Sequence, residues 1–243
     1  MGFKCGIVGL PNVGKSTLFN ALTQTVQAQA ANYPFCTIEP NIGEVPIPDP
    51  RLDNLAQIAK SQSVVATKMT FVDIAGLVEG ASKGEGLGNK FLANIREMDA
   101  IAYVLRCFDN DDVSHVNNKI DPIADSQTVE TELMMADLES VEKRLYVVGK
   151  KAKSGDKEST DLLPVLGKAL KVLEQGIPTR VLEWKPDEEF IFHGLQLLTA
   201  KPVLYVCNVD EDSTANGNEY SKKISKLALS EGADSVVICV EIE

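Results

Sequence analysis

The sequence predicts an α/β protein in which helices flank a mostly parallel sheet and an antiparallel helical hairpin is inserted. Two observations support this fold class. Apolar runs of strand length alternate with helical patterns over the first 110 residues, and the alternation resumes after residue 200. Such alternation favours a parallel sheet with helices on both faces. Between these two parts, apolar residues recur every three or four positions, which is typical of long packed helices.

The elements of the sheet follow in order along the chain. The first part predicts strands at 4–9, 69–76 and 100–108 and helices at 15–25 and 88–98. The last part predicts strands at 201–209 and 235–240 and a helix at 219–232. We therefore expect one discontinuous α/β domain, formed by residues 1–122 and 199–243.

Residues 123–198 are expected to form the inserted helical subdomain. Its first helix should carry a heptad seam, which consists of Met134, Leu138, Val141, Leu145, Val148 and Ala152. A turn at 153–159 should lead to a returning helix, whose seam consists of Leu162, Leu166, Ala169 and Leu173. A short helix is expected near 187–198. Coiled-coil-like hairpins of this kind usually act as interaction surfaces.

Composition excludes several classes of protein. The formal net charge of −11 argues against binding along DNA, and no apolar run has the length of a membrane span. The five cysteines are scattered without a Cys-x-x-Cys pair, so we expect reduced thiols in a cytoplasmic protein. The two histidines argue against a zinc site.

The stretch "GLPNVGKST" (9–17) lies between a predicted strand and a predicted helix. It fits G-x4-G-K-[ST], the Walker A motif, in the context that this motif requires. Its backbone N–H groups should wrap phosphates, with the helix N-terminus adding its positive dipole end. Lys15 should reach the β- and γ-phosphates, and the Ser16 hydroxyl should bind Mg²⁺. The predicted nucleotide-binding residues of this loop are Asn12, Val13, Gly14, Lys15, Ser16 and Thr17.

Two further segments indicate a switch of the GTPase type. "DIAG" (73–76) ends a predicted strand, so Asp73 should hold the magnesium ion through a water molecule. The Gly76 N–H should contact the γ-phosphate, and we therefore assign Gly76 and Lys15 to catalysis. "NYPFCTIEPN" (32–41) should supply Thr37 as a further magnesium ligand.

The stretch "YVCNVDEDS" (205–213) is placed where such proteins read the base. A guanine-specific loop has Asn-Lys-x-Asp, whereas this chain has Asn208, Val209, Asp210 and Glu211. The longer side chain of Glu211 breaks the bidentate geometry with guanine, and Val209 offers an apolar contact to a base. The amide of Asn208 can pair with adenine. We predict a preference for ATP over GTP; the alternative is a degenerate loop that reads no base.

With these motifs, the chain resembles the YchF / Obg-like ATPase family. The resemblance rests on "GASKGEGLGNKFL" (80–92), "NYPFCTIEPN", "PDPRLD" (48–53) and the "NVDE" loop. It implies a G domain with a helical hairpin insert, ATP hydrolysis in preference to GTP hydrolysis, and association with the ribosome through its large subunit. Members of the family continue into a C-terminal TGS domain. Because this chain stops at Glu243, we expect a truncated form in which functions of that domain are missing.

Two of three candidate functions remain open on the sequence alone. The first is a slow ATPase switch, and the second is a module that senses adenine nucleotides with negligible hydrolysis. The second is supported by Leu77, which stands where Ras-like proteins have the glutamine that orients water. A small-molecule kinase is disfavoured because the insert resembles a rigid hairpin and not a lid. His115 is a candidate catalytic residue, and Asn12 is a candidate for retaining K⁺ beside the phosphates, as in some related GTPases.

Overall fold

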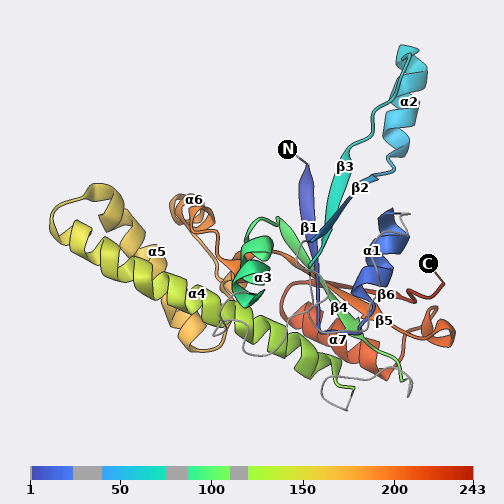
Figure 1. Ribbon diagram of the computed structural model, residues 1–243. Coiled ribbons are helices and arrows are strands. Elements are labelled where there is room, and N and C mark those ends of the chain that lie inside the picture. Colours follow the sequence, from blue (N-terminus) through green and yellow to red (C-terminus); the bar gives the residue numbers. More distant parts are fainter. Residues whose placement is uncertain (1, 24–39, 75–86, 110–119, 243) are drawn as a thin grey trace.

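The computed structural model describes residues 2–23, 40–74, 87–109 and 120–242 (Figure 1). Its centre is a six-stranded sheet with the order β2-β3-β1-β4-β5-β6. The strands are β1 Phe3–Val8, β2 Asn41–Pro46, β3 Lys68–Asp73, β4 Ala100–Arg106, β5 Val203–Asn208 and β6 Asp234–Ile238. All neighbouring pairs are parallel except β2 and β3. This arrangement confirms the predicted α/β fold with a mostly parallel sheet.

Parallel pairing places the carboxyl ends of the central strands at one edge of the sheet. Ile7 of β1 lies opposite Asp73 of β3, and Val8 lies opposite Tyr103 of β4. The central strands β1 and β4 are buried over most of their length, with Ile7, Val8 and Val104 fully enclosed. Ligands of open α/β sheets bind in the crevice outside the carboxyl ends of the strands. The fold therefore brings the carboxyl ends of β1, β3 and β5 to the expected place.

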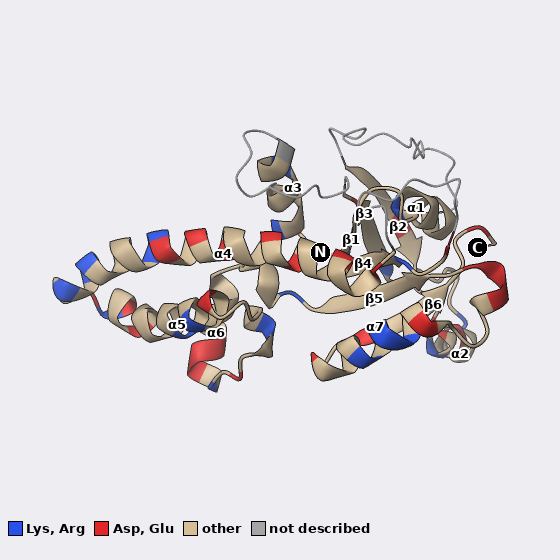
Figure 2. Cartoon of the chain, turned by 90° about the horizontal axis from the view of Figure 1, so that it is seen from below, with Lys and Arg blue, Asp and Glu red and all other residues tan. Residues whose placement is uncertain are grey.

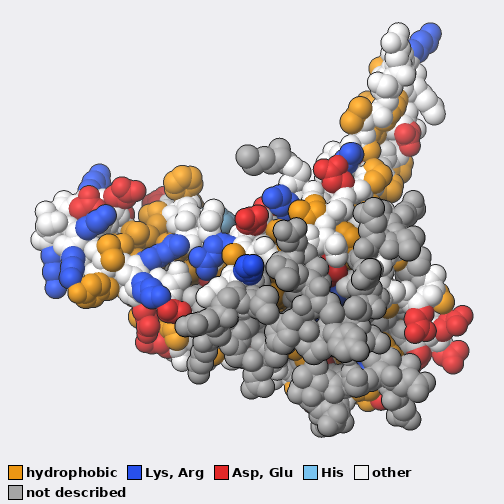
Figure 3. All heavy atoms as spheres, in the orientation of Figure 1, with side chains coloured by type: hydrophobic (Ala, Val, Ile, Leu, Met, Phe, Trp, Pro, Cys, Tyr) orange, Lys and Arg blue, Asp and Glu red, His pale blue; other side chains and the backbone are white. Residues whose placement is uncertain are grey.

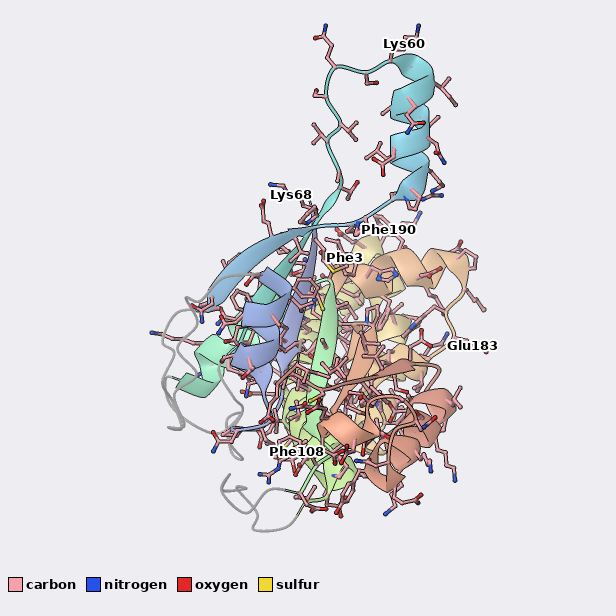
Figure 4. The ribbon with its side chains drawn as sticks, turned by 90° about the vertical axis from the view of Figure 1, so that its right-hand side faces the viewer. Phe3, Lys60, Lys68, Phe108, Glu183 and Phe190 are labelled. Carbon is pink, nitrogen blue, oxygen red and sulfur yellow. The ribbon has the colours of Figure 1, made fainter. Side chains whose placement is uncertain are left out.

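The edge formed by β2 and the helix α2, Pro50–Ala59, was not expected from the sequence. β2 pairs antiparallel with β3, and α2 projects away from the sheet toward Lys60 (Figures 1 and 4). The helix begins locally, because the Asp49 side chain accepts a hydrogen bond from the Arg51 N–H and Pro50 occupies the first turn. None of its residues is buried, so α2 adds nothing to the core.

Helices cover both faces of the sheet. α1, Lys15–Thr23, packs on β1, β2 and β3, whereas α7, Glu219–Ser230, packs on β5 and β6. α3, Leu87–Arg96, precedes β4 along the chain, and Ile95 on it is fully buried. These helices enclose the apolar core that the strands begin.

The segment between β4 and β5 is mainly helical. α4, Pro122–Lys153, and α5, Lys157–Glu174, are joined by three residues and pack along each other, with α6, Pro186–Gly194, beside them (Figure 1). Asp121 caps α4 through the Ala124 N–H, which explains why this helix begins before the periodic apolar pattern. Val141, Leu166 and Ala169 of the expected seams are fully buried in a separate core. Figure 3 shows Lys and Arg side chains gathered over these helices.

A buried ionic cluster joins the helical segment to the sheet. Arg180 lies in the short helix η1, Thr179–Val181, and its terminal nitrogens bond Glu130 of α4 at 2.8 Å and Glu231 after α7 at 3.1 Å. Tyr103 donates to Glu130 at 2.9 Å, and Tyr205 donates to Glu231 at 2.7 Å. We call these five residues the junction cluster. It connects α4 and α7 to the middle of β4 and β5.

Candidate phosphate and base site

The loop between β1 and α1 has the backbone conformation of a phosphate-binding loop. Asn12 has φ 62° and Gly14 has φ 98°, both in the left-handed region. A Cβ on Gly14 would lie 2.7 Å from the Asn208 amide nitrogen, and one on Gly9 would lie 2.4 Å from the Val104 carbonyl oxygen. A side chain would require a backbone shift at Gly9 and movement of neighbouring side chains at Gly14, where the positive φ also favours glycine. Glycine at these two positions therefore allows the loop to lie close to β4 and β5.

Lys15 begins α1 and is buried at the base of this loop, with 8% of its surface exposed. Its ammonium donates to the Leu10 carbonyl at 2.7 Å, which holds it inside the curve of the loop. Burial lowers the pKa of Lys15 to about 8, although the nearby Asp73 carboxylate acts in the opposite direction. A buried cation with so little compensating charge gains strongly from an anion placed above it.

Ser16 and Asp73 meet at the carboxyl ends of β1 and β3. The Ser16 hydroxyl donates to an Asp73 carboxylate oxygen at 2.8 Å. Burial raises the pKa of Asp73, while hydrogen bonds from Ser16 and Asn41 and the charge of Lys15 lower it. A hydroxyl and a carboxylate at this spacing are the hard oxygen ligands that Mg²⁺ takes in nucleotide sites. The donor set therefore fits a magnesium ion bound together with phosphate oxygens.

Asn41 is a member of this site that the sequence analysis did not assign. It is the first residue of β2 and lies opposite Asp73 in the antiparallel ladder, where its side chain bonds the carboxylate. It is also the last residue of the quoted segment "NYPFCTIEPN", which was the available signal. The three assigned residues Thr37, Gly76 and His115 lie outside the described residues, as does Leu77.

Asn208 ends β5 and connects three loops. Its amide nitrogen donates to the Val13 carbonyl at 3.1 Å, and its amide oxygen accepts from the Val240 N–H at 3.2 Å. The side chain is almost fully buried. Asn208 therefore fixes the phosphate loop against the segment after β6.

The next three residues have distinct environments. Val209 is 2% exposed within the main core, and its N–H donates to the Ile238 carbonyl at 2.8 Å. The Asp210 carboxylate accepts from the Ser213 N–H at 2.9 Å and caps the short helix η3, Glu211–Ser213. Glu211 is exposed at the first position of that helix. Of the two adjacent carboxylates, Asp210 is used by the loop and Glu211 is open to a ligand.

Two negative findings hold for the described residues 2–23, 40–74, 87–109 and 120–242. No group of three or more His, Cys, Asp and Glu residues there has the arrangement of a metal cluster. No helix in the same ranges is both long enough and apolar enough to span a membrane.

Comparisons with known proteins agree with this geometry. The family described as "50S ribosome-binding GTPase" matches residues 4–151. Over its whole length the chain is 58% identical to the ribosome-binding ATPase YchF of Haemophilus ducreyi and covers 66% of that protein. The same protein of Bacillus subtilis is 50% identical and is covered to 67%.

A solved structure of a YchF protein also resembles this chain. The structure of the Schizosaccharomyces pombe YchF GTPase matches 99% of this chain with a TM-score of 0.80 and 39% sequence identity. The chain covers 66% of that structure, so it spans about 66% of the length of several of these relatives. Sequence and fold agree over almost the entire chain, and the chain belongs to the YchF family.

Proposed function

We propose that the protein is a magnesium-dependent ATP-binding and ATP-hydrolysing switch that prefers ATP to GTP and acts at the ribosome. The observation that carries this proposal is the group formed by Lys15, Ser16 and Asp73. A buried ammonium lies under the phosphate loop, and a hydroxyl and a carboxylate 2.8 Å apart lie beside it. This arrangement supplies one site for phosphate charge and an adjacent site for a divalent cation.

Different residues of the chain would bind the phosphates and the metal ions. Backbone N–H groups from Asn12 to Thr17 and the Lys15 ammonium would bind the phosphates, and the N-terminus of α1 favours negative charge. Ser16 and Asp73 would hold Mg²⁺, with Thr37 as a further ligand. The metal would neutralise charge on the β- and γ-phosphate oxygens during their separation. Asn12 remains the residue that we assign to a K⁺ ion beside the phosphates.

The base preference rests on the loop after β5. Glu211 is the exposed carboxylate at the position where guanine-specific loops carry aspartate, and adenine lacks the two donors that such an aspartate binds. We infer slow intrinsic turnover, because Leu77 cannot orient the attacking water and assistance would then come from Gly76, His115 or a partner.

The partner is inferred from the relatives. Those proteins are named ribosome-binding ATPases, and the matching family is described as binding the 50S ribosome. We therefore propose the large ribosomal subunit as the partner and the cytoplasm as the location. A second function, sensing of adenine nucleotides with negligible hydrolysis, is favoured by Leu77 in place of the water-orienting glutamine.

Metal-dependent binding and turnover test the proposal. Calorimetry with ATP should show strong binding with Mg²⁺ and much weaker binding with EDTA, and Ser16→Ala should remove most of that difference. Thr23→Ala, a hydroxyl removed at the far end of the same helix, is the control. Equal affinity with and without the metal would contradict the magnesium assignment. Phosphate release with and without ribosomes separates the switch from the sensing module, which would show no release in either case.

A further inference from the structure

The outer edge of β6 is open within the described part of the chain. β6 is the last strand in the order of the sheet and pairs only with β5. The Ile238 carbonyl accepts from the Val209 N–H, so the backbone groups of Ile238 face β5. Along a strand of a parallel sheet, the backbone N–H and C=O groups of successive residues point to opposite edges of the strand. The N–H and C=O groups of Ser235 and Val237 therefore point outward, where a further strand can pair with them.

An open groove runs beside this edge. It has a volume of about 810 Å³ and lies between α7, the loop 214–217 and the side chain of Val237. The Ser225 and Ser235 hydroxyls bond each other at 2.8 Å, which fixes α7 on this face of β6. Gly217 shapes the end of the groove, since a Cβ there would lie 2.5 Å from the Ser221 hydroxyl.

The wall contributed by α7 is basic. Lys222, Lys223 and Lys226 line the groove, and Figure 2 shows them as a blue band along the helix. Lys222 pairs with Glu219 at 3.3 Å, whereas Lys223 and Lys226 have no acidic partner among the described residues. These two lysines are three positions apart on the helix and so are neighbours on its surface. Although the chain has a net charge of −11, these two adjacent unpaired lysines make the α7 wall of the groove locally positive.

The surroundings favour a short acidic segment over a nucleic acid. Acidic residues also lie here, because Glu219 lines the groove and the exposed Asp234 begins β6, and they would repel a continuous phosphate backbone. A peptide needs only two carboxylates, and on one face of a strand they recur every second residue, about 6.6 Å apart. That spacing is close to the separation of about 5–6 Å between neighbouring side chains on a helix.

We propose that the groove between α7 and the β6 edge binds an extended acidic segment of a partner protein. The segment adds to the sheet beside β6 and pairs with the outward groups of Ser235 and Val237. Its carboxylates on the α7 face contact Lys223 and Lys226. Edge-strand addition of this kind takes affinity from the main chain and specificity from alternate side chains. This surface is separate from the nucleotide site, so its test does not depend on ATP binding.

A charge-reversal experiment tests the lysines. A fluorescein-labelled ten-residue peptide of alternating valine and glutamate serves as the probe, and its anisotropy is measured against the full chain. Lys223→Glu with Lys226→Glu should weaken binding at least tenfold; both residues are exposed on a helix, where glutamate is well tolerated. Lys150→Glu with Lys153→Glu, at the end of α4, makes the same charge change elsewhere and should have little effect. Equal losses in the two variants would overturn the proposal.

Backbone pairing is tested with the same peptide in two N-methylated forms. One form is methylated on every valine and the other on every glutamate, so each loses the donors of one strand edge. Strand addition predicts that one form loses binding and the other keeps it, and that the Ser235 and Val237 amides exchange hydrogen more slowly in the complex. If both forms bind as well as the parent peptide, strand addition is wrong. It is also wrong if oligouridylate binds through Lys223 and Lys226 while the peptide does not.

Discussion

The phosphate site and the junction cluster both bury charge, but they differ in how that charge is compensated. The Lys15 ammonium has a carbonyl oxygen and the nearby Asp73, and burial lowers its pKa. Burial also acts to lower the pKa of Arg180, yet Glu130 and its other partners raise it above the ordinary value. A buried charge with little compensation beside the carboxyl ends of the strands indicates a binding role, whereas a charge whose partners lie within the chain indicates a structural role.

Removal of the ammonium should have the largest effect on binding. Lys15→Ala should abolish detectable ATP binding in calorimetry, because the phosphate loop then has no buried cation. The same variant should not lower the free energy of unfolding, since it removes a charge that costs energy to bury. ATP affinity equal to that of the wild type would overturn the phosphate site. A large loss of stability would show that Lys15 has a structural role, as Arg180 does.

Removal of the Arg180 guanidinium should have the opposite effect, because it should lower stability and leave ATP binding unchanged. Arg180→Ala leaves two largely buried carboxylates without their partner, and such a change costs about 3–5 kcal/mol of unfolding free energy. ATP affinity of the folded fraction should stay the same. Arg51→Ala is the matched control, because that arginine forms an exposed pair with Asp49 and should cost less than about 1 kcal/mol. Chemical denaturation of the three proteins measures the difference, and equal losses would show that the junction cluster contributes no special stability.

The pKa of Lys15 also predicts that ATP binding takes up a proton. Because burial lowers this pKa to about 8, much of the ammonium is deprotonated at pH 8.5 in the free protein, and little is at pH 7. Negative phosphates favour the charged form, so they raise the pKa and the site binds a proton together with the nucleotide.

Calorimetry in two buffers with different ionisation enthalpies measures this uptake. It should be a large fraction of one proton at pH 8.5 and close to zero at pH 7. Lys15→Arg remains charged throughout and should show no uptake at either pH. Uptake that is the same at both values would show that the ammonium is not under-compensated in the free protein.

The two regions also differ in how far the sequence predicts them. The strands that end at Asp73 and Asn208, and the strand before the phosphate loop, follow from apolar runs, and the phosphate loop itself follows from a local motif. Arg180 could not be assigned, because its partners Glu130 and Glu231 are 50 and 51 positions away. β2 was missed for a similar reason. Its sequence "NIGEVP" is short and interrupted by glycine, so its pairing with β3 supplies the strand identity that local pattern does not.

The smallest predicted effect concerns the base preference, where Glu211 differs from the aspartate of a guanine-specific loop by one methylene. In an Asn-Lys-x-Asp loop, aspartate accepts two hydrogen bonds from guanine that adenine cannot offer. An unpaired polar group costs roughly 1–3 kcal/mol, which corresponds to about tenfold or more in affinity. Glu211→Asp restores the shorter carboxylate at the open position, so GTP should gain about tenfold relative to ATP.

Glu211→Asp should be tested alone. Val209 is buried in the core, so Val209→Lys would bury a charge and lower stability before it altered the base preference. Asp212→Asn, at the next exposed carboxylate, is the control and should leave the preference unchanged. Competition of ATP and GTP against a fluorescent ATP analogue measures both variants and the wild type. If GTP displaces the analogue from the wild type as well as ATP does, then Glu211 does not exclude guanine. The loop after β5 would then serve, through Asn208, only to hold the phosphate loop in place.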